Sequence, residues 1–461
     1  MAAIPVPERV RRWLAPPVAF VTASLGMMCI VCTPLAGRQL TAVATLDDRF
    51  VGWVGVGAIA GFAAAVTGLL SVVRTGAGPP IAVGAAAAMF GLALGDEVET
   101  STQLALALVI LGFASGALIV AGVCLTLELP PGWRYPTVVA WVMPLVAGWP
   151  LIGWRALHHD SPGEVNLAVH PSLWVVAVVS AALVLWAALA MLLDPPRSYD
   201  VTSQGWEIPW QVLAVVVAGV LIAVMLVGFA PDLQAVWLRP IVLVVSAAGV
   251  IGLALTTLLV PLLSARVGYV AILVVSVCAP TCVYLLLTTA DVAGGEVSAP
   301  VVLVLTAAAL AGSGVGWRRP MVSVELGLLV LAASAAGGWV MPSHGWWMAA
   351  AVAPFMLGSG ACLVGGVRLS LTSPMTLRFA AAALVGAVLL GLLGAAPVSW
   401  ALAGDAPVGA GGARAGGRAI LGLTFAASVL GAAYVSVLAS RLRSRSTPSG
   451  QKALEPSEQV G

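Results

Sequence analysis

The sequence predicts an all-α, polytopic membrane protein with about fourteen transmembrane helices. Hydrophobic residues make up 61% of its 461 residues, and charged residues make up only 9%. Soluble domains have about a quarter of their residues charged, so these charges are too few to cover a soluble surface, and most of the surface must face lipid. The third observation is the recurrence of apolar runs of roughly 20 residues, the length that crosses a bilayer as a helix.

These runs are bounded by charged residues or by clusters of proline and glycine. In chain order they lie at 16–36, 50–73, 80–95, 101–127, 135–154, 172–194, 208–230, 240–264, 267–290, 299–316, 321–341, 345–367, 373–397 and 417–440. The third run is the weakest because it is short and rich in alanine and glycine. The basic segment 8–13 precedes a run without a small-residue cleavage pattern, so we expect a retained first helix rather than a signal peptide.

The basic residues test this number of spans, because cytoplasmic loops of membrane proteins are rich in lysine and arginine. With fourteen spans and the N-terminus inside, 15 of the 21 basic residues fall on the cytoplasmic side: Arg9, Arg11, Arg12, Arg74, Arg134, Arg197, Arg266, Arg318, Arg319, Arg368, Arg378, Arg441, Arg443, Arg445 and Lys452. Omitting one span would reverse every later loop and remove this separation. We therefore expect a multi-pass protein of the inner (cytoplasmic) membrane with both termini cytoplasmic. Residues 1–15 are then a cytoplasmic N-terminal segment, and the polar residues 441–461 a disordered cytoplasmic tail.

The residue types exclude several kinds of chemistry. The single lysine, Lys452, lies in the tail, whereas a phosphate-binding P-loop needs a lysine in a glycine-rich loop of the protein body. His158, His159, Asp160 and His170 share one loop, but their spacing matches no metal-ligand pattern, and a solvated loop is the simpler interpretation. No loop is long enough to be a catalytic domain. We expect no enzyme activity, no cofactor or metal, and neither a nucleotide nor a nucleic acid as partner.

Small residues and prolines inside the spans predict close helix contacts. Gly57 and Gly61 in the second span, and Gly112 and Gly116 in the fourth, are GxxxG pairs that let two helices approach closely. Prolines remove backbone hydrogen bonds, which a bundle tolerates where a neighbour or a cavity replaces them. They lie at Pro34, Pro144, Pro150, Pro261, Pro280 and Pro354. The cysteines Cys29, Cys32, Cys124, Cys278, Cys282 and Cys362 all lie in apolar runs and are expected to act as small hydrophobic residues.

Three segments resemble the fourteen-span drug:proton antiporter branch of the major facilitator superfamily. Residues 108–134 resemble its fourth span with the short turn that follows, and residues 170–196 resemble its sixth span. Residues 141–154 resemble its fifth-span antiporter motif, with Pro150 and Gly153 at the centre and tryptophans in place of flanking glycines.

The resemblance implies two six-helix halves, at residues 16–200 and 266–440, with two inserted helices at 201–265. Arg318 and Arg319, in the sequence WRRP, stand where the second half has its cytoplasmic turn. In the family, charged residues at such turns are associated with holding one conformational state.

The loop between the second and third spans departs from the family pattern. Residues 71–80 read SVVRTGAGPP, whereas the family has Gly-x-x-x-Asp-Arg-x-Gly-Arg-Arg. Arg74 and Gly76 match its Arg-x-Gly, but Val73 stands at the Asp. A single arginine is also what the positive-inside rule leaves in a short inner loop. The family's charged network is therefore incomplete in this chain.

Two further departures concern proton coupling. Leu108, Leu111 and Gly112 stand at the fourth-span Arg-x-x-Gln-Gly of the family, and the first-span Asp falls at about Thr33. Buried ionisable groups carry protons because their pKa values can be shifted by their surroundings. Without these groups, the coupling route that the resemblance implies is missing.

Glu325 is the remaining candidate for coupling. It lies about one turn into the eleventh predicted span, and an ionisable residue inside a membrane is a functional candidate by default. It is also close enough to the predicted inner face to pair with Arg318 or Arg319, or to interact with the helix dipole. A purely structural role is therefore the alternative.

The sequence favours a secondary transporter or facilitator of a small, largely apolar molecule, with efflux as the direction that the resemblance implies. Its partners would be the lipid bilayer and the small-molecule substrate. The alternative is a non-transporting membrane scaffold on the same fold, or a partner of cell-envelope machinery, because missing motifs would characterise such a protein. A lipid-linked precursor flippase or membrane-embedded enzyme is a third possibility, but the charged cavity residues that a flippase needs are hard to find.

Overall fold

The computed structural model describes residues 14–29, 50–96, 100–130, 132–139, 178–189, 257–258, 263–292, 299–340, 345–371 and 412–446. Within these ranges the chain forms helices and turns and no strand. The labelled helices are α2 (Phe50–Thr75), α3 (Gly78–Asp96), α4 (Ser101–Glu128), α9 (Leu263–Val292), α10 (Ala299–Arg318), α11 (Pro320–Val340), α12 (Gly345–Leu371) and α14 (Gly412–Ser446). The apolar segments Leu14–Cys29 and Val178–Leu189 are also helical, as are residues 132–139.

Each labelled helix covers all or nearly all of one predicted span, so the all-helical, polytopic class is confirmed. Four described segments are long and apolar enough to cross a membrane, judged by length and composition: Ala105–Thr126, Pro320–Trp339, Val352–Ser370 and Leu421–Leu442. The seventh and thirteenth predicted spans, and nearly all of the inserted region 201–265, lie outside the described residues. The number of fourteen spans and the domain limits therefore stay predictions.

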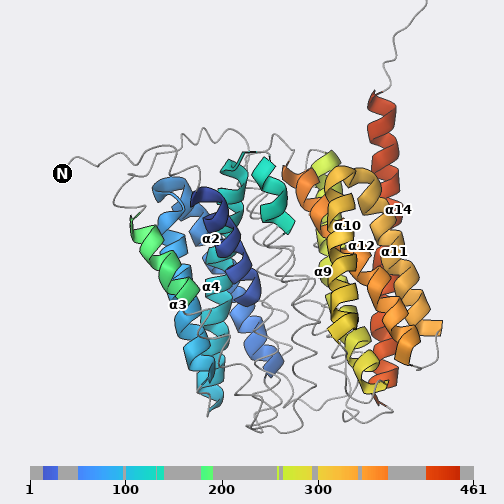
Figure 1. Ribbon diagram of the computed structural model, residues 1–461, viewed down its shortest axis with the longest axis horizontal. Helices are drawn as coiled ribbons and strands as arrows, with labels where there is room; N and C mark the ends of the chain where they lie inside the picture. The colour runs from blue at the N-terminus through green and yellow to red at the C-terminus, as the bar shows by residue number, and fades with distance from the viewer. Residues whose placement is uncertain are drawn as a thin grey trace, which may run out of the picture.

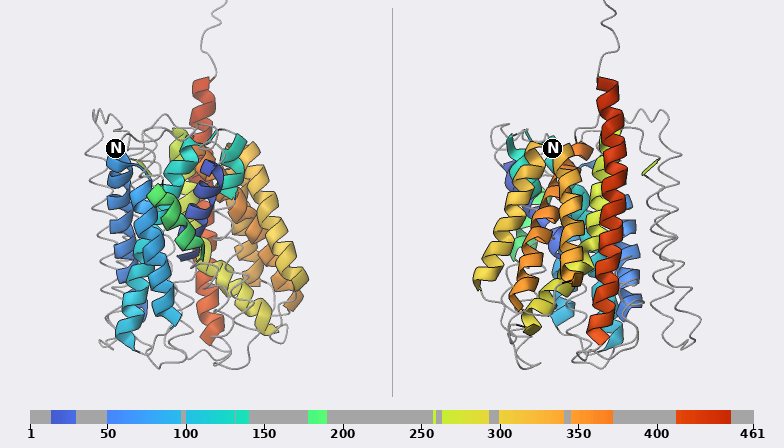
Figure 2. Two further views of the ribbon diagram at one scale, coloured as in Figure 1. Left: turned by 60° about the vertical axis from the view of Figure 1, so that its left-hand side comes forward. Right: turned by 90° about the vertical axis from the view of Figure 1, so that its right-hand side faces the viewer.

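The labelled helices form two groups that stand side by side (Figure 1). Helices α2, α3 and α4 pack on one another in the N-terminal group, and α9, α10, α11, α12 and α14 do so in the C-terminal group. All extensive contacts between labelled helices lie within one group. Helix α14 lies on the side of the C-terminal group that faces away from α2–α4, and it extends beyond the other helices at one end (Figure 2).

The turn between α2 and α3 follows from its sequence. Gly76 has a φ of +85°, a left-handed conformation that glycine adopts without steric cost. Its N–H donates to the carbonyl of Val72 at 3.1 Å. Pro79 and Pro80 lie in the first turn of α3, where a backbone N–H has no partner inside the helix. The tight turn predicted for this loop is confirmed.

The two glycine pairs of the N-terminal group pack against each other. The sequence predicted close helix contacts at these glycines but not that the two pairs are partners. A Cβ atom on Gly57 would lie 2.6 Å from the carbonyl oxygen of Leu108, and one on Gly61 would lie 2.7 Å from that of Gly112. A Cβ atom on Gly112 or Gly116 would overlap the carbonyl oxygens of Gly57 and Gly61. Helices α2 and α4 are therefore in backbone contact, and only glycine permits this distance.

The C-terminal group repeats this crossing between α10 and α12. Gly312 faces the carbonyl oxygen of Leu357, and a Cβ atom on Gly316 would lie 2.6 Å from that of Ala361. In both groups, two glycines four residues apart face two carbonyl groups four residues apart on the partner helix. The sequence analysis did not single out Gly312 and Gly316, although their GxxxG spacing is visible in the sequence.

A continuous cluster of buried apolar side chains joins the two groups. It includes Val72, Ile119 and Val138 from the N-terminal group, and Val267 and Leu305 from the C-terminal group. A second cluster lies within the N-terminal group, where Val178–Leu189 packs with Leu14–Cys29, α3 and α4. The two groups are thus held together mainly by apolar contact.

The predicted start of the disordered tail is wrong. Helix α14 continues through Arg441 as far as Ser446, whereas the sequence analysis placed a disordered extension from Arg441 onward. Leucine and arginine are good helix formers, and arginines near a helix C-terminus interact favourably with the helix dipole. These two effects explain why the helix extends beyond the end of the apolar run.

Candidate functional site

Glu325 lies on α11, at its contact with α14. Its side chain is half-buried, and Oε1 accepts a hydrogen bond from the Ser436 hydroxyl, with 2.5 Å between the two oxygens. Among the acidic residues that the structure describes, Glu325 is the only one inside a helix rather than in its last two residues. Helices α11 and α14 lie on the side of the C-terminal group away from α2–α4 (Figure 1).

The pairing of Glu325 with Arg318 or Arg319 that the sequence analysis considered is not formed. Both arginines are exposed, and no ion pair joins them to Glu325 within the described ranges. Ser323 fixes the turn between α10 and α11, because its hydroxyl donates to the carbonyls of Val315 (2.9 Å) and Arg319 (2.7 Å). Glu325 instead faces α14, where Ser436 binds its carboxylate.

A second polar contact lies on α14, two turns before Ser436. The Ser428 hydroxyl is buried and lies 3.6 Å from the Cys278 thiol of α9. Buried Leu328 lies near Gly431, at a depth between the two contacts. The carboxylate and the buried hydroxyl–thiol pair are therefore separated by apolar side chains.

The described interior carries no buried charge. Apart from the Tyr269 hydroxyl and the cysteine thiols, its buried polar side chains are serines and threonines: Thr22, Ser115, Thr126, Thr137, Ser180, Thr257, Ser313, Ser323, Ser334, Ser359, Ser370, Thr424 and Ser428. Leu108 and Leu111, which replace the arginine and glutamine of the family motif, are 1% and 2% exposed. Helix α4 thus presents leucine at positions where the resemblance implies charged and amide groups.

The other predicted site residues fall at turns and helix crossings. Gly112 and Gly116 lie at the α2–α4 crossing, Gly76 ends α2, and the backbone of Arg74 lies in the last turn of that helix. Pro150 and Gly153, together with the histidine-containing loop, lie outside the described residues. Among the described residues, no three histidine, cysteine or acidic side chains are grouped so that they could hold a metal ion.

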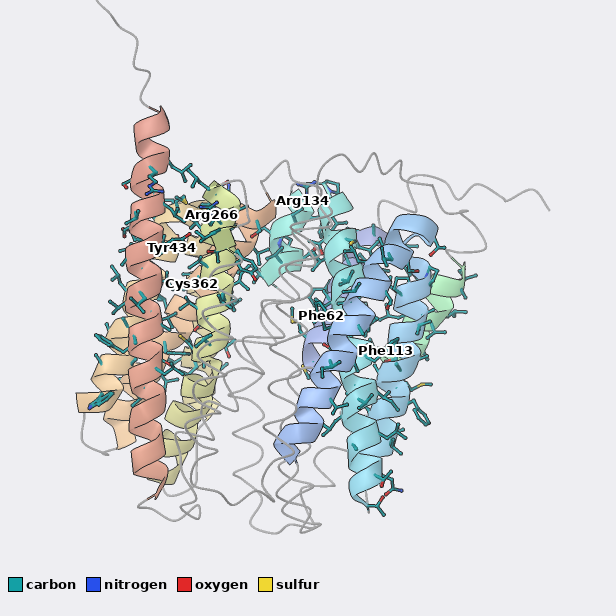
Figure 3. All side chains as sticks on the ribbon, turned by 180° about the vertical axis from the view of Figure 1, so that it is seen from behind. Phe62, Phe113, Arg134, Arg266, Cys362 and Tyr434 are labelled. Atoms are coloured by element: carbon teal, nitrogen blue, oxygen red, sulfur yellow. The ribbon has the colours of Figure 1, made fainter. Side chains whose placement is uncertain are left out.

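Several arginines gather at one end of the bundle. Figure 3 shows Arg134 and Arg266 at the end where α14 extends beyond the other helices. Arg134 Nε donates to the carbonyl of Leu129 at 2.8 Å, and an Arg266 guanidinium nitrogen donates to that of Leu258 at 3.0 Å. Helices α10 and α12 also finish at this end (Figure 1). We call it the arginine end (Arg134, Arg266, Arg318, Arg319 and Arg368).

At the arginine end the structure brings together three side chains that the sequence analysis did not connect. The rings of Tyr135 and Trp317 have centroids 5.1 Å apart and planes inclined by 39°. The guanidinium carbon of Arg368 lies 5.2 Å from the Trp317 ring centroid. An aromatic residue beside arginine in both WRY (133–135) and WRR (317–319) was the available sequence signal.

No protein-family model matches the sequence, and no curated protein matches it. Solved structures of transporters do match its fold. A POT family transporter in complex with 5-aminolevulinic acid has a TM-score of 0.55 and 12% identity, covering 92% of this chain and 96% of that chain. The Escherichia coli fucose:proton symporter has a TM-score of 0.55 and 11% identity, covering 91% and 98%. A bacterial homologue of the human lysosomal transporter Spinster, solved inward-facing and unoccupied, has a TM-score of 0.52 and 14% identity, covering 95% and 99%.

These likenesses define the class of fold. The chain shares the fold of these solved transporters, and the match extends over nearly the whole of each of them. The family resemblance stated from sequence motifs is thus supported at the level of the fold. The fourteen-span antiporter branch remains a prediction.

Proposed function

We propose that this protein is a secondary transporter or facilitator that moves a small, largely apolar molecule out of the cell. The observation that carries this proposal is its fold, which matches transporters over more than nine-tenths of its own length and of theirs. The matched region includes both groups of helices, so the likeness is to the whole transporter fold and not to one half of it. The bilayer and the solute are then its principal partners.

The described interior supports a neutral or weakly charged solute. Transfer of a charged solute into a site without charged or strongly polar groups costs several kcal/mol or more, since nothing replaces its hydration. Most of the buried polar groups that the described residues offer are serine and threonine hydroxyls. They suit an apolar molecule with a few hydrogen-bonding atoms.

We propose that the two groups of helices move relative to each other during transport. The backbone crossings at Gly57/Gly61 with Gly112/Gly116, and at Gly312/Gly316, hold each group as one body. The turns at Arg74–Gly76 and Arg318–Arg319, and the Pro150–Gly153 segment, are proposed as the positions that adjust when the groups tilt. In this proposal residues 16–200 and 266–440 form the two halves, 201–265 form two inserted helices, and both termini face the cytoplasm.

Transport can be tested with cells and proteoliposomes. Cells that express the protein should retain less of at least one apolar dye or antibiotic than cells with an empty vector. Purified protein in liposomes should move the same compound. Unchanged retention across a broad panel, together with a membrane protein that co-purifies in constant ratio, would instead support the scaffold alternative.

We propose Glu325 as the coupling residue, because it is the acid inside a described helix. The Glu325→Gln variant removes the charge but keeps a carbonyl oxygen that can accept from Ser436. Proton-dependent transport should be lost in this variant, while the protein remains folded. Proteoliposomes in which Glu325→Gln keeps the wild-type response to an imposed pH gradient would restrict Glu325 to a structural role.

A further inference from the structure

The contact of Tyr135, Trp317 and Arg368 joins two groups of helices that otherwise meet mainly through aliphatic side chains. Tyr135 lies on the helical segment 132–139, which follows α4 of the N-terminal group. Trp317 and Arg368 lie near the ends of α10 and α12 in the C-terminal group. Both distances, 5.1 Å and 5.2 Å, are in the range of favourable aromatic and cation–π pairs.

Trp317 is rigidly held within the C-terminal group. It follows Gly316, where a Cβ atom would lie 2.6 Å from the carbonyl oxygen of Ala361 and 3.0 Å from the nitrogen of Gly365. This crossing is two residues from the end of α10, whereas Gly61 is 14 residues from the end of α2. The C-terminal group therefore has a close backbone contact at the arginine end, one residue before the tryptophan.

Tyr135 is held by the N-terminal group. The neighbouring Arg134 donates through Nε to the carbonyl of Leu129, which follows α4, and Thr137 donates to the carbonyl of Trp133 at 2.8 Å. The Tyr135 hydroxyl would lie 3.4 Å from a Cβ atom on Gly314, so the ring rests along α10. The tyrosine and the tryptophan thus belong to two separately fixed bodies and meet at one contact.

We propose that Tyr135, Trp317 and Arg368 form a latch that holds the arginine end of the two groups closed. The turn 71–80 at the end of α2 contains no acidic residue. At the arginine end the two groups make a ring contact between Tyr135 and Trp317, and this contact supplies the attraction in the latch. Arg368 adds a cation–π contact to the Trp317 ring. The latch rests on the proposed function, because opening of this end is needed only if a solute passes there.

The latch can be tested by measuring distance between the groups without any solute. Gly132 is exposed with nothing within 4 Å of a Cβ position, and Val322 on α11 is 52% exposed. Spin labels attached at these two positions through non-canonical amino acids leave every native cysteine unchanged. Electron–electron distance measurements in liposomes then report the open and closed populations.

Tyr135→Ala and Trp317→Ala should each raise the ratio of open to closed protein about tenfold. Tyr135→Phe keeps the ring and serves as the matched control, with the wild-type ratio. Arg368→Gln should give a smaller shift in the same direction. Where the open population is measurable in wild type, an unchanged ratio in Tyr135→Ala, or equal effects of Tyr135→Phe and Tyr135→Ala, would reject the latch.

If the open form is too rare to detect by distance measurements, amide hydrogen exchange of residues 132–139 tests the latch instead. Exchange should be about tenfold faster in Tyr135→Ala than in wild type and unchanged in Tyr135→Phe. Equal rates in all three proteins reject the latch. Neither measurement depends on transport, so the latch can be detected even in a protein that moves no solute. If the variants transport solute but show unaltered distances and exchange rates, the latch is rejected and the proposed transport function stands.

Discussion

At the scale of single residues, the Ser436–Glu325 contact is the clearest polar interaction between two helices of the C-terminal group. The two residues are 111 positions apart in sequence, so no local pattern connects them. A hydroxyl that donates to a carboxylate offsets part of the cost of removing that charge from water. This makes Ser436 the positioning residue for Glu325 whether the carboxylate couples protons or only ties α11 to α14.

Replacing Ser436 by alanine should lower stability. We expect a loss of about 1–2 kcal/mol, around the lower end of the range for hydrogen bonds to charged groups, because Glu325 is half-exposed. Thermal unfolding in detergent measures this as a lower Tm than that of wild type. Ser440→Ala is the matched control one turn further along α14, where an exposed hydroxyl donates only to the carbonyl of Val437. Equal Tm values for the two variants would contradict this assignment.

At the scale of helices, the crossing of α2 and α4 depends on glycine at particular positions and not throughout the helix. Gly61 and Gly68 lie on the same helix, two turns apart. A Cβ atom on Gly61 would lie 2.7 Å from a carbonyl oxygen, whereas one on Gly68 would lie 3.7 Å from its nearest neighbour, Ala117. One glycine is therefore required for contact, and the other is replaceable.

Gly61→Ala should destabilise the protein by about 1–3 kcal/mol, the usual cost of overpacking. Gly68→Ala should leave stability unchanged or raise it by up to about 1 kcal/mol, because alanine has the higher helix propensity. The Tm of the two purified variants tests the difference. Equal decreases in the Tm of Gly61→Ala and Gly68→Ala would show that α2 tolerates no side chain at either position, which would contradict the geometry.

At the scale of the whole molecule, described arginines that the loop analysis placed on one side of the membrane lie at one end of the bundle. Arg134 and Arg266, which the fourteen-span interpretation placed on the same side, lie at the same end of the bundle (Figure 3). That end is where α14 continues with Arg441. The agreement concerns described residues only, so the parity of the spans still needs a measurement.

Reporter fusions test this parity. Fusions of a reporter that is active only in the cytoplasm should be active at both chain ends, since an even number of spans returns the chain to its starting side. A fusion within the predicted outer loop 95–99 should be inactive and serves as the internal control. Activity at one terminus alone would require an odd number of spans.

Much of the fold could be predicted from the sequence because it depends on local composition. The length of each apolar run determines that a helix can cross the bilayer, Gly76 and the two prolines determine the turn after α2, and GxxxG spacing marks helices that approach closely. Each of these is a property of a few consecutive residues. The physical reason is that a backbone in lipid must satisfy its own hydrogen bonds, so a sufficiently apolar run becomes a helix wherever it lies.

The partners of the helices were decided only by the tertiary structure. Spans that are apolar on every side carry no stripe that shows which face turns inward, so the sequence could not pair Glu325 with Ser436. For the same reason it could not bring Tyr135 to Trp317, or set Gly312 and Gly316 against α12. Those contacts depend on the rotation and depth of each helix relative to its neighbours, and side-chain fit over the whole bundle determines both.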